Sequence, residues 1–239
     1  MKEYSSTQML KIVKEYNRMR SDLSCMVVFY MIQYFKCKKI LELGFYQGQT
    51  FGVMLEATDR GSHLSTVDIN FINDLYYKYY KDSQYTDGKS VEFFNISSLD
   101  FQTNTKFDFI NIDTGDDRKQ DFINSLDWIS ENGIIMFDNY DTPYFHYISN
   151  ELINLDTPFY PFLIDGQAMY FVRVGSDTSN FEKMLADKLR EIAVLDRIKF
   201  RNEVFLASLT PIKLSTFNDT DSFLLPPEVM QPLLKHLKI

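Results

Sequence analysis

The chain has 239 residues, of which 45% are hydrophobic and 24% charged, and its formal net charge is −8. These values are typical of a folded α/β domain with additions, and they argue against a disordered chain. Nucleic-acid binding is disfavoured because it needs clustered positive charge.

The cysteine count and the apolar runs predict the cellular setting. Cys25 and Cys37 are the two cysteines and lack CxxC spacing, so we expect buried free thiols in a reducing, cytoplasmic compartment. The N-terminal residues do not resemble a signal peptide, and no apolar run reaches the ~20 residues that span a bilayer. We therefore expect no membrane partner.

Apolar residues recur at helical spacing over residues 7–36, which predicts two helices, or one that breaks near Ser21. Five short apolar runs then alternate with helical segments. The runs are KKILEL, LSTVDI, VEFFNI, KFDFINID and GIIMFD. Such alternation predicts a parallel sheet with helices on both faces. The link SSLDFQTNT, between the third and fourth runs, leaves room for little more than a helical turn.

The rhythm changes after the fifth run. Only residues 165–167 separate FYPFLI from AMYFVRV, which is too short for a parallel crossover and predicts an antiparallel hairpin. The expected fold is a Rossmann-like, doubly wound α/β sheet of mainly parallel strands ending in that hairpin. We divide the chain into N-terminal helices (1–37), this core (38–175) and a C-terminal helical extension with an irregular tail (176–239). The tail could close a pocket, form a subunit contact or pack on the core.

The stretch ILELGFYQGQT, residues 40–50, joins the first predicted strand to a helix. Gly44 permits a sharp turn, and Gly48 lets the backbone approach a ligand without a Cβ. A helix that begins near Gln49 or Thr50 offers free N–H groups to an anion. A turn that binds nothing would show the same glycines, so both interpretations stay open.

Asp68 ends the second predicted strand, where a carboxylate can accept hydrogen bonds from both hydroxyls of a ribose. It follows Gly44 at close to the ~20 residues expected between such a turn and its acid. Together these features predict a nucleoside-containing cofactor. The G-x-G-x-x-G pattern of nicotinamide-binding folds is missing. Glu42, inside the first strand, disfavours a pyrophosphate and suits a cationic cofactor such as S-adenosylmethionine.

ILELGFYQGQT followed by LSTVDIN resembles motif I and the subsequent acid of the class I S-adenosylmethionine-dependent methyltransferases. The terminal hairpin is also that family's usual ending, and the likeness spans about residues 38–175. The motif is most similar to the catechol and caffeoyl-CoA type of O-methyltransferase. The resemblance implies a cofactor site with the methionine part at Glu42, Tyr46 and Thr50, the ribose at Asp68 and the adenine at Ser97 or Ser98.

A second group of oxygen-bearing side chains closes two later strands: Asp113 after the fourth, and Asp138 with Asn139 after the fifth. Neighbouring parallel strands bring these ends together beside the cofactor, and such ligands suit Mg²⁺. The catechol-type enzymes hold Mg²⁺ with a similar Asp and Asp-Asn pair. A bound Mg²⁺ would ease deprotonation of a hydroxyl acceptor. The same residue types also cap helices and form turns, so a structural role stays open.

The general base is not assigned by the pattern. The resemblance implies a lysine shortly after Asp113, but that position holds none, and a histidine is absent too. Lys119 is the remaining candidate base, with a solvated helix start beside Asp116 and Asp117 as the alternative.

The expected function is therefore S-adenosylmethionine-dependent O-methylation of a small-molecule hydroxyl, assisted by a divalent metal. One alternative is a metal-independent methyltransferase that acts on a sugar, an amine or a protein. Another is a non-catalytic cofactor-binding module. A homo-oligomer formed through the terminal helices is the expected assembly.

Overall fold

The computed structural model describes residues 8, 22–70, 86, 88–115, 118–138, 159–161, 163–164, 168–172 and 204–205. Its helices are α2 (Asp22–Phe35), α3 (Gln49–Ala57) and α5 (Arg118–Trp128). The strands that run parallel are β1 (Lys39–Leu43), β2 (His63–Val67), β3 (Ser90–Phe94), β4 (Phe107–Ile112) and β5 (Ile129–Asp138). The remaining strands are β6 (Phe159–Pro161), β7 (Leu163–Ile164), β8 (Ala168–Val172) and β9 (Val204–Phe205).

The main sheet has the strand order β3-β2-β1-β4-β5-β8-β6. Its pairs from β3 to β5 are parallel, whereas β8 pairs antiparallel with both β5 and β6. The predicted parallel sheet with a terminal antiparallel hairpin is therefore confirmed. The strand order reverses between β1 and β4, and ligands of open α/β sheets bind at such a reversal, beyond the carboxyl ends of the strands.

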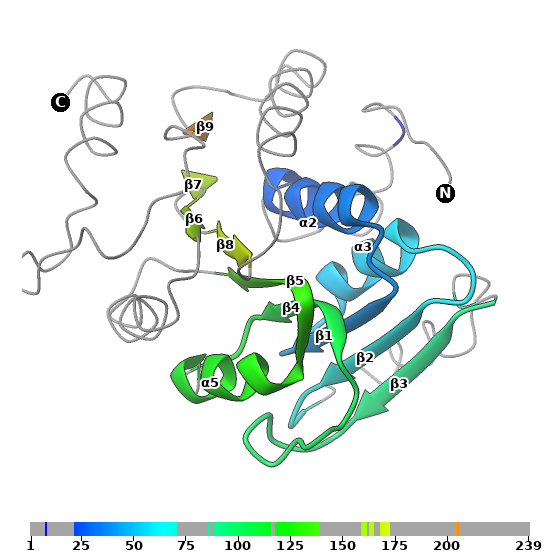
Figure 1. The fold of residues 1–239 in the computed structure, drawn as a ribbon, viewed down its shortest axis with the longest axis vertical. Helices are drawn as coiled ribbons and strands as arrows, with labels where there is room; N and C mark the ends of the chain where they lie inside the picture. The colour runs from blue at the N-terminus through cyan, green and yellow to red at the C-terminus, as the bar shows by residue number, and fades with distance from the viewer. Residues whose placement is uncertain are drawn as a thin grey trace, which may run out of the picture.

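Helices cover both faces of the sheet, with α2 and α3 on one side and α5 on the other (Figure 1). Phe51 of α3 packs on Phe93 of β3, with ring centroids 5.5 Å apart. On the opposite face Phe122 of α5 packs on Phe137 of β5 at 5.4 Å. The doubly wound arrangement that the alternating pattern predicts is thus present.

The link from β3 to β4 contains a turn and extended chain in place of a helix. Phe101 covers the sheet there, with its ring 5.0 Å from that of Phe94 and 5.2 Å from that of Trp128. It is only 2% exposed, and burial of such a side chain contributes about 1.5–3 kcal/mol. The link contains no full helix, as its length predicts, and the side chain of Phe101 covers this part of the sheet instead.

Two elements differ from the sequence expectation. β5 begins at Ile129, directly after α5 and before the apolar run at 133–138. A register shift against β4 between Phe107 and Phe109 and a left-handed Asn132 (φ 63°) accommodate this early start. β9 lies in the predicted irregular tail and pairs with β7. The helical segment expected after the second apolar run, at residues 71–80, and the helix expected after Ser176 lie outside the described residues. The proposed domain limits stay predictions.

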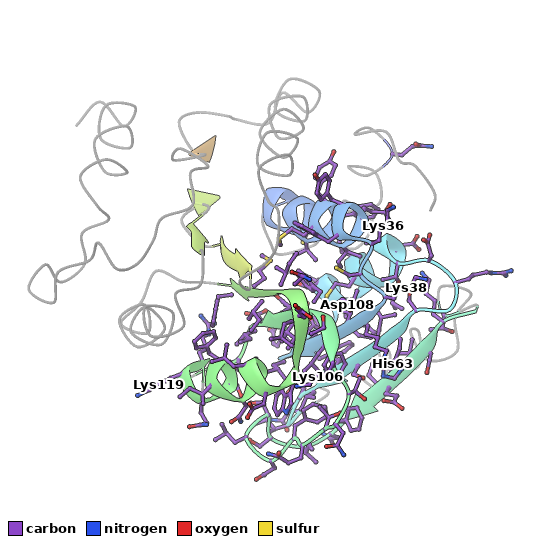
Figure 2. The ribbon with its side chains drawn as sticks, viewed as in Figure 1. Lys36, Lys38, His63, Lys106, Asp108 and Lys119 are labelled. Atoms are coloured by element: carbon purple, nitrogen blue, oxygen red, sulfur yellow. The ribbon has the colours of Figure 1, made fainter. Side chains whose placement is uncertain are left out.

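Both cysteines are buried and neither forms a disulfide, as predicted. Burial raises the pKa of the Cys37 thiol, and the neighbouring charge of Asp108 raises it further. Asp108 also accepts hydrogen bonds from the backbone N–H groups of Lys38 and Lys39 at 2.9 and 3.0 Å, which fixes the start of β1 (Figure 2). Within the described parts of the chain, no helix has the length and apolarity needed to cross a membrane.

Candidate functional site

The link between β1 and α3 is a sharp turn built on left-handed residues. Gly44, Tyr46 and Gly48 have φ angles of 96°, 45° and 70°. Gly48 is the N-cap of α3, which begins at Gln49. The predicted turn and helix start are thus confirmed, and the turn lies at the carboxyl end of β1.

Gly44 is required by the close approach of another strand. A Cβ at this position would lie 2.4 Å from the carbonyl oxygen of Asp113, at the end of β4. Hydrogen bonds hold this approach in place: Gly44 N–H donates to the Val67 carbonyl and Asp113 N–H donates to the Leu43 carbonyl, each at 2.8 Å. The lack of a side chain at Gly44 therefore allows the ends of β1, β2 and β4 to lie close together at the site.

Asp68 binds the turn itself. The N–H groups of Phe45 and Tyr46 both donate to its Oδ2 at 2.8 Å, and Asn70 N–H donates to its Oδ1 at 2.8 Å. Successive backbone N–H groups of this kind form an anion-binding nest, and here the anion is the Asp68 carboxylate. Since each carboxylate oxygen accepts about two hydrogen bonds, Oδ1 retains capacity for a ligand hydroxyl.

The segment after β3 is tied to the end of β2 by Asn95, a residue that the sequence analysis missed. Its side-chain amide donates to the carbonyls of Asp68 and Ile69 at 3.0 and 2.8 Å. Ser97 and Ser98 follow in a turn, and the carbonyl of each accepts a hydrogen bond from the N–H group three residues further on, in Asp100 and Phe101. The available signal was a polar residue near the end of the third apolar run, VEFFNI. Asn95 thus sets where the two serines lie relative to Asp68.

A cavity of about 510 Å³ opens at this edge of the sheet, within the size range of small-molecule sites. The predicted site residues that line it are Gly44, Tyr46, Asp68, Ser97, Ser98 and Asp113. The residues that line it without having been predicted are Val67, Ile69, Thr114, Gly115 and Arg118. One pocket therefore brings together the ends of β1, β2 and β4 and the segment after β3.

Other predicted residues do not line this cavity. Glu42 is 1% exposed on the face under α3, where the Thr66 hydroxyl donates to its Oε2 at 3.2 Å. Gly48 and Thr50 are buried at the start of α3. Lys119 is exposed and points outward from α5 (Figure 2). The assigned roles of these four residues stay predictions.

Asp113 is paired with an arginine that the sequence analysis did not single out. Nη2 of Arg118 lies 3.8 Å from Oδ1 of Asp113, and the two side chains are only 11% and 15% exposed. The Nε–H group of Arg118 donates to the Thr114 carbonyl. The Thr114 hydroxyl in turn donates to the fully buried Asp121 at 2.5 Å. This network fixes the guanidinium group beside Asp113; its only signal in the sequence was an arginine shortly after the strand-end acid.

Among the described residues, those beside Asp113 do not form a divalent-cation site. The side chain of Asp138 and the whole of Asn139 lie outside the described residues, and the described part of the chain contains no group of three His, Cys, Asp or Glu that could hold a metal. Asp113 already has a permanently charged guanidinium group beside it. The magnesium site thus stays a prediction, and Arg118 argues against it.

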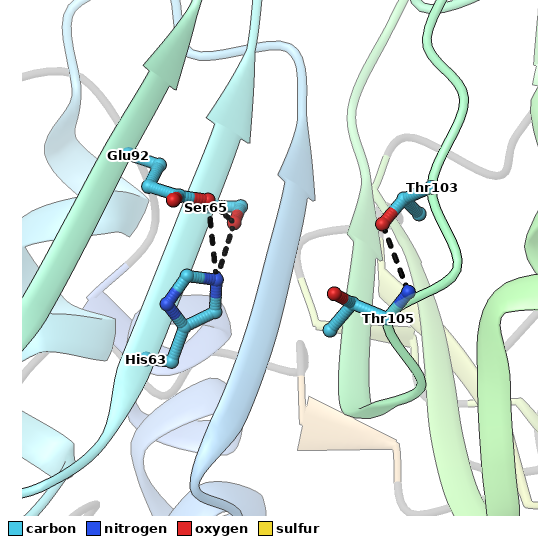
Figure 3. Close-up of polar contacts among 5 residues, drawn as sticks. All are labelled: His63, Ser65, Glu92, Thr103 and Thr105. Atoms are coloured by element: carbon cyan, nitrogen blue, oxygen red, sulfur yellow. Dashed lines mark hydrogen bonds and ion pairs between the residues drawn. The ribbon is translucent and has the colours of Figure 1, made fainter.

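A separate cluster of His63, Ser65 and Glu92 lies on β2 and β3, outside the cavity (Figure 3). Nε2 of His63 is 3.1 Å from the Ser65 hydroxyl and 3.3 Å from Oε2 of Glu92. A serine hydrolase needs the acid and the serine on opposite ring nitrogens of the histidine. Both contact the same nitrogen here, so the cluster is a cross-strand polar contact without the geometry of a catalytic triad.

No protein-family model matches the sequence, and no curated protein matches it. Many solved structures do share its fold. The O-methyltransferase of Bacillus cereus, solved with S-adenosylhomocysteine, is 18% identical with a TM-score of 0.53, and the match covers 72% of this chain and 92% of that one. TomG of Streptomyces achromogenes, an O-methyltransferase of tomaymycin synthesis solved with S-adenosylmethionine, is 14% identical with a TM-score of 0.52, covering 73% and 92%.

A methyltransferase of Geobacter sulfurreducens is also similar, at 12% identity and a TM-score of 0.52, again covering 73% of this chain and 92% of the other. At such low identities the likeness establishes a common fold. The chain therefore has the Rossmann-like α/β fold found in these methyltransferases, over nearly their whole length.

Proposed function

We propose that the chain is an S-adenosylmethionine-dependent methyltransferase that methylates a hydroxyl group of a small molecule. The observation that carries this proposal is a cavity that the β1 turn, Asp68 and Asp113 line together at the switch point of the sheet. The fold shared with O-methyltransferases supports the same function.

The turn suits this cofactor better than a dinucleotide. In a dinucleotide site the N–H groups after β1 bind a pyrophosphate. Here the N–H groups of Phe45 and Tyr46 bind Asp68 instead, so they do not need an anionic ligand. The cavity also contains two carboxylates, Asp68 and Asp113, against one guanidinium group. This balance favours a cofactor with a cationic sulfonium and ammonium group.

The cofactor, when bound, supplies an electrophilic methyl group. Asp68 would hold its ribose through Oδ1, and Ser97 and Ser98 lie on the same side for its adenine. Asp113 and Arg118 lie on the other side of the β1 turn, where the acceptor would bind. Orientation of the acceptor accounts for most of the rate gain in such transfers, and Asp113 is the carboxylate at hand to accept the hydroxyl proton.

The test is calorimetric titration of the full chain with S-adenosylmethionine, S-adenosylhomocysteine and, separately, NAD⁺. We expect both adenosyl compounds to bind and NAD⁺ not to. Asp68→Asn should weaken S-adenosylhomocysteine binding at least tenfold, because the amide nitrogen cannot accept from the turn or from a ribose.

Asp100→Asn is the matched control. It removes the same charge at an exposed residue that does not line the cavity, and it should bind like the wild type. Failure of both adenosyl compounds to bind would contradict the proposed function. Binding without methylated product across a broad panel of hydroxyl compounds would favour the non-catalytic module.

A further inference from the structure

We infer that Arg118, and no divalent metal ion, is the counter-cation of Asp113 in this pocket. The inference rests on the proposed function and specifies how the acceptor side of the site is charged. It assigns Arg118 as a positioning residue for Asp113 and makes the site metal-independent.

Arg118 is held in place by hydrogen bonds within the protein. Its Nε–H group is fixed by the Thr114 carbonyl, and Thr114 is fixed by its hydrogen bond to Asp121 inside the protein. The side chain is 11% exposed, unlike a surface arginine that swings freely in solvent. Its guanidinium group is therefore directed at Asp113 before any ligand binds.

The positive charge of Arg118 also disfavours a divalent cation at Asp113. Arg118 is the only lysine or arginine among the described residues that line the cavity. Mg²⁺ binds carboxylate oxygens at about 2.0–2.1 Å. An ion on Oδ1 of Asp113 would therefore lie within about 6 Å of Nη2, given the 3.8 Å separation of these two atoms. A low-dielectric pocket strengthens the repulsion between two such cations.

The geometry of the guanidinium group suits a second role, in binding the acceptor. A guanidinium group has five N–H donors in a fixed fork, and one of them is used by Thr114. The positive charge of Arg118 lies in the cavity lining and can attract an acceptor oxygen while it also compensates the charge of Asp113. Arg118 can therefore position the acceptor in the way that a metal ion would otherwise do.

The experiment measures the affinity of the full chain and its variants for Mn²⁺, with Mn²⁺ alone as the probe. Electron paramagnetic resonance reports the concentration of the free ion. We expect wild type and Asp113→Asn to bind Mn²⁺ equally weakly. Arg118→Met should bind it at least tenfold more tightly than wild type, and the double variant Asp113→Asn with Arg118→Met should lose that gain. Lys38→Met, which removes an exposed cation that does not line the cavity, should match wild type.

Tight binding of one Mn²⁺ by wild type that is lost in Asp113→Asn would overturn the inference, and so would an Arg118→Met variant with no gain. The comparison of wild type with Asp113→Asn still decides the question if Arg118→Met does not fold. Titration of the same preparations with S-adenosylhomocysteine separates the two proposals. Wild type that binds neither S-adenosylhomocysteine nor Mn²⁺ contradicts the proposed function, whereas S-adenosylhomocysteine binding together with tight Mn²⁺ binding contradicts only the role of Arg118.

Discussion

Replacement of Gly44 by alanine tests the argument that this residue is needed where β1 meets β4. The new Cβ would lie 2.4 Å from the carbonyl oxygen and 2.7 Å from the carbonyl carbon of Asp113. Both are backbone atoms, so no side chain can rotate away to relieve the clash. The end of β4 would have to move, and Asp113 would move with it.

Two costs add at this position. The left-handed backbone, with φ of 96°, costs an alanine about 1–2 kcal/mol. Overpacking against fixed neighbours costs about 1–3 kcal/mol more. We therefore expect Gly44→Ala to lower the free energy of unfolding by about 2–5 kcal/mol.

Gly61→Ala is the control that separates these costs. Gly61 also has a left-handed φ, of 83°, but a Cβ there would meet nothing within 4 Å. It should lose only the backbone part, about 1–2 kcal/mol. The effect of alanine on the unfolded chain is similar in the two variants and cancels in their difference.

The assay is urea unfolding of wild type and both variants, followed by titration with S-adenosylhomocysteine. Gly44→Ala should be the less stable variant by about 1–3 kcal/mol and should bind S-adenosylhomocysteine more weakly than Gly61→Ala does. Equal destabilisation by the two substitutions would refute the argument, because the clash with Asp113 would then contribute nothing.

Two further predictions concern buried groups. Because burial raises the pKa of the Cys37 thiol, the reactive thiolate is absent near pH 8; an aromatic disulfide reagent should not label the native protein but should label both cysteines in urea, and rapid native labelling would contradict this. Neither side-chain amide atom of Asn111 has a hydrogen-bond partner among the described residues, and an unsatisfied buried amide costs about 1–3 kcal/mol. Asn111→Leu should therefore raise the free energy of unfolding in urea, while a fall accompanied by loss of S-adenosylhomocysteine binding would show that the amide serves the ligand.

The order of elements and the position of the site could be predicted from the sequence, because both depend on local patterns. Alternating apolar runs and helical segments specify a parallel sheet, and a link of three residues before AMYFVRV forces a hairpin. Gly44 and Asp68 stand at strand ends, and parallel strands place those ends at one edge. That edge is where the cavity lies.

The face on which a strand residue lies could not be predicted in the same way. Residues of a strand that is buried on both faces are apolar throughout, so the pattern does not say which face each one takes. The pairing of Glu42 with Thr66 and Asn111 across three strands is set by register. Only the register puts the carboxylate of Glu42 under α3 and away from the cavity wall.

Partnership between side chains was likewise decided by the tertiary structure. Asp68 was predicted to meet a ligand, but the fold also brings it within 2.8 Å of two backbone N–H groups of the turn after β1. The sequence analysis assigned no role to Arg118, whereas in the structure the buried Asp121 and Thr114 fix its direction toward Asp113. Sequence alone thus determined which residues stand at the carboxyl edge of the sheet. The tertiary structure decided which of them compensate one another's charge, because that depends on distances of a few ångströms between segments far apart in the chain or on the orientation of a helix end.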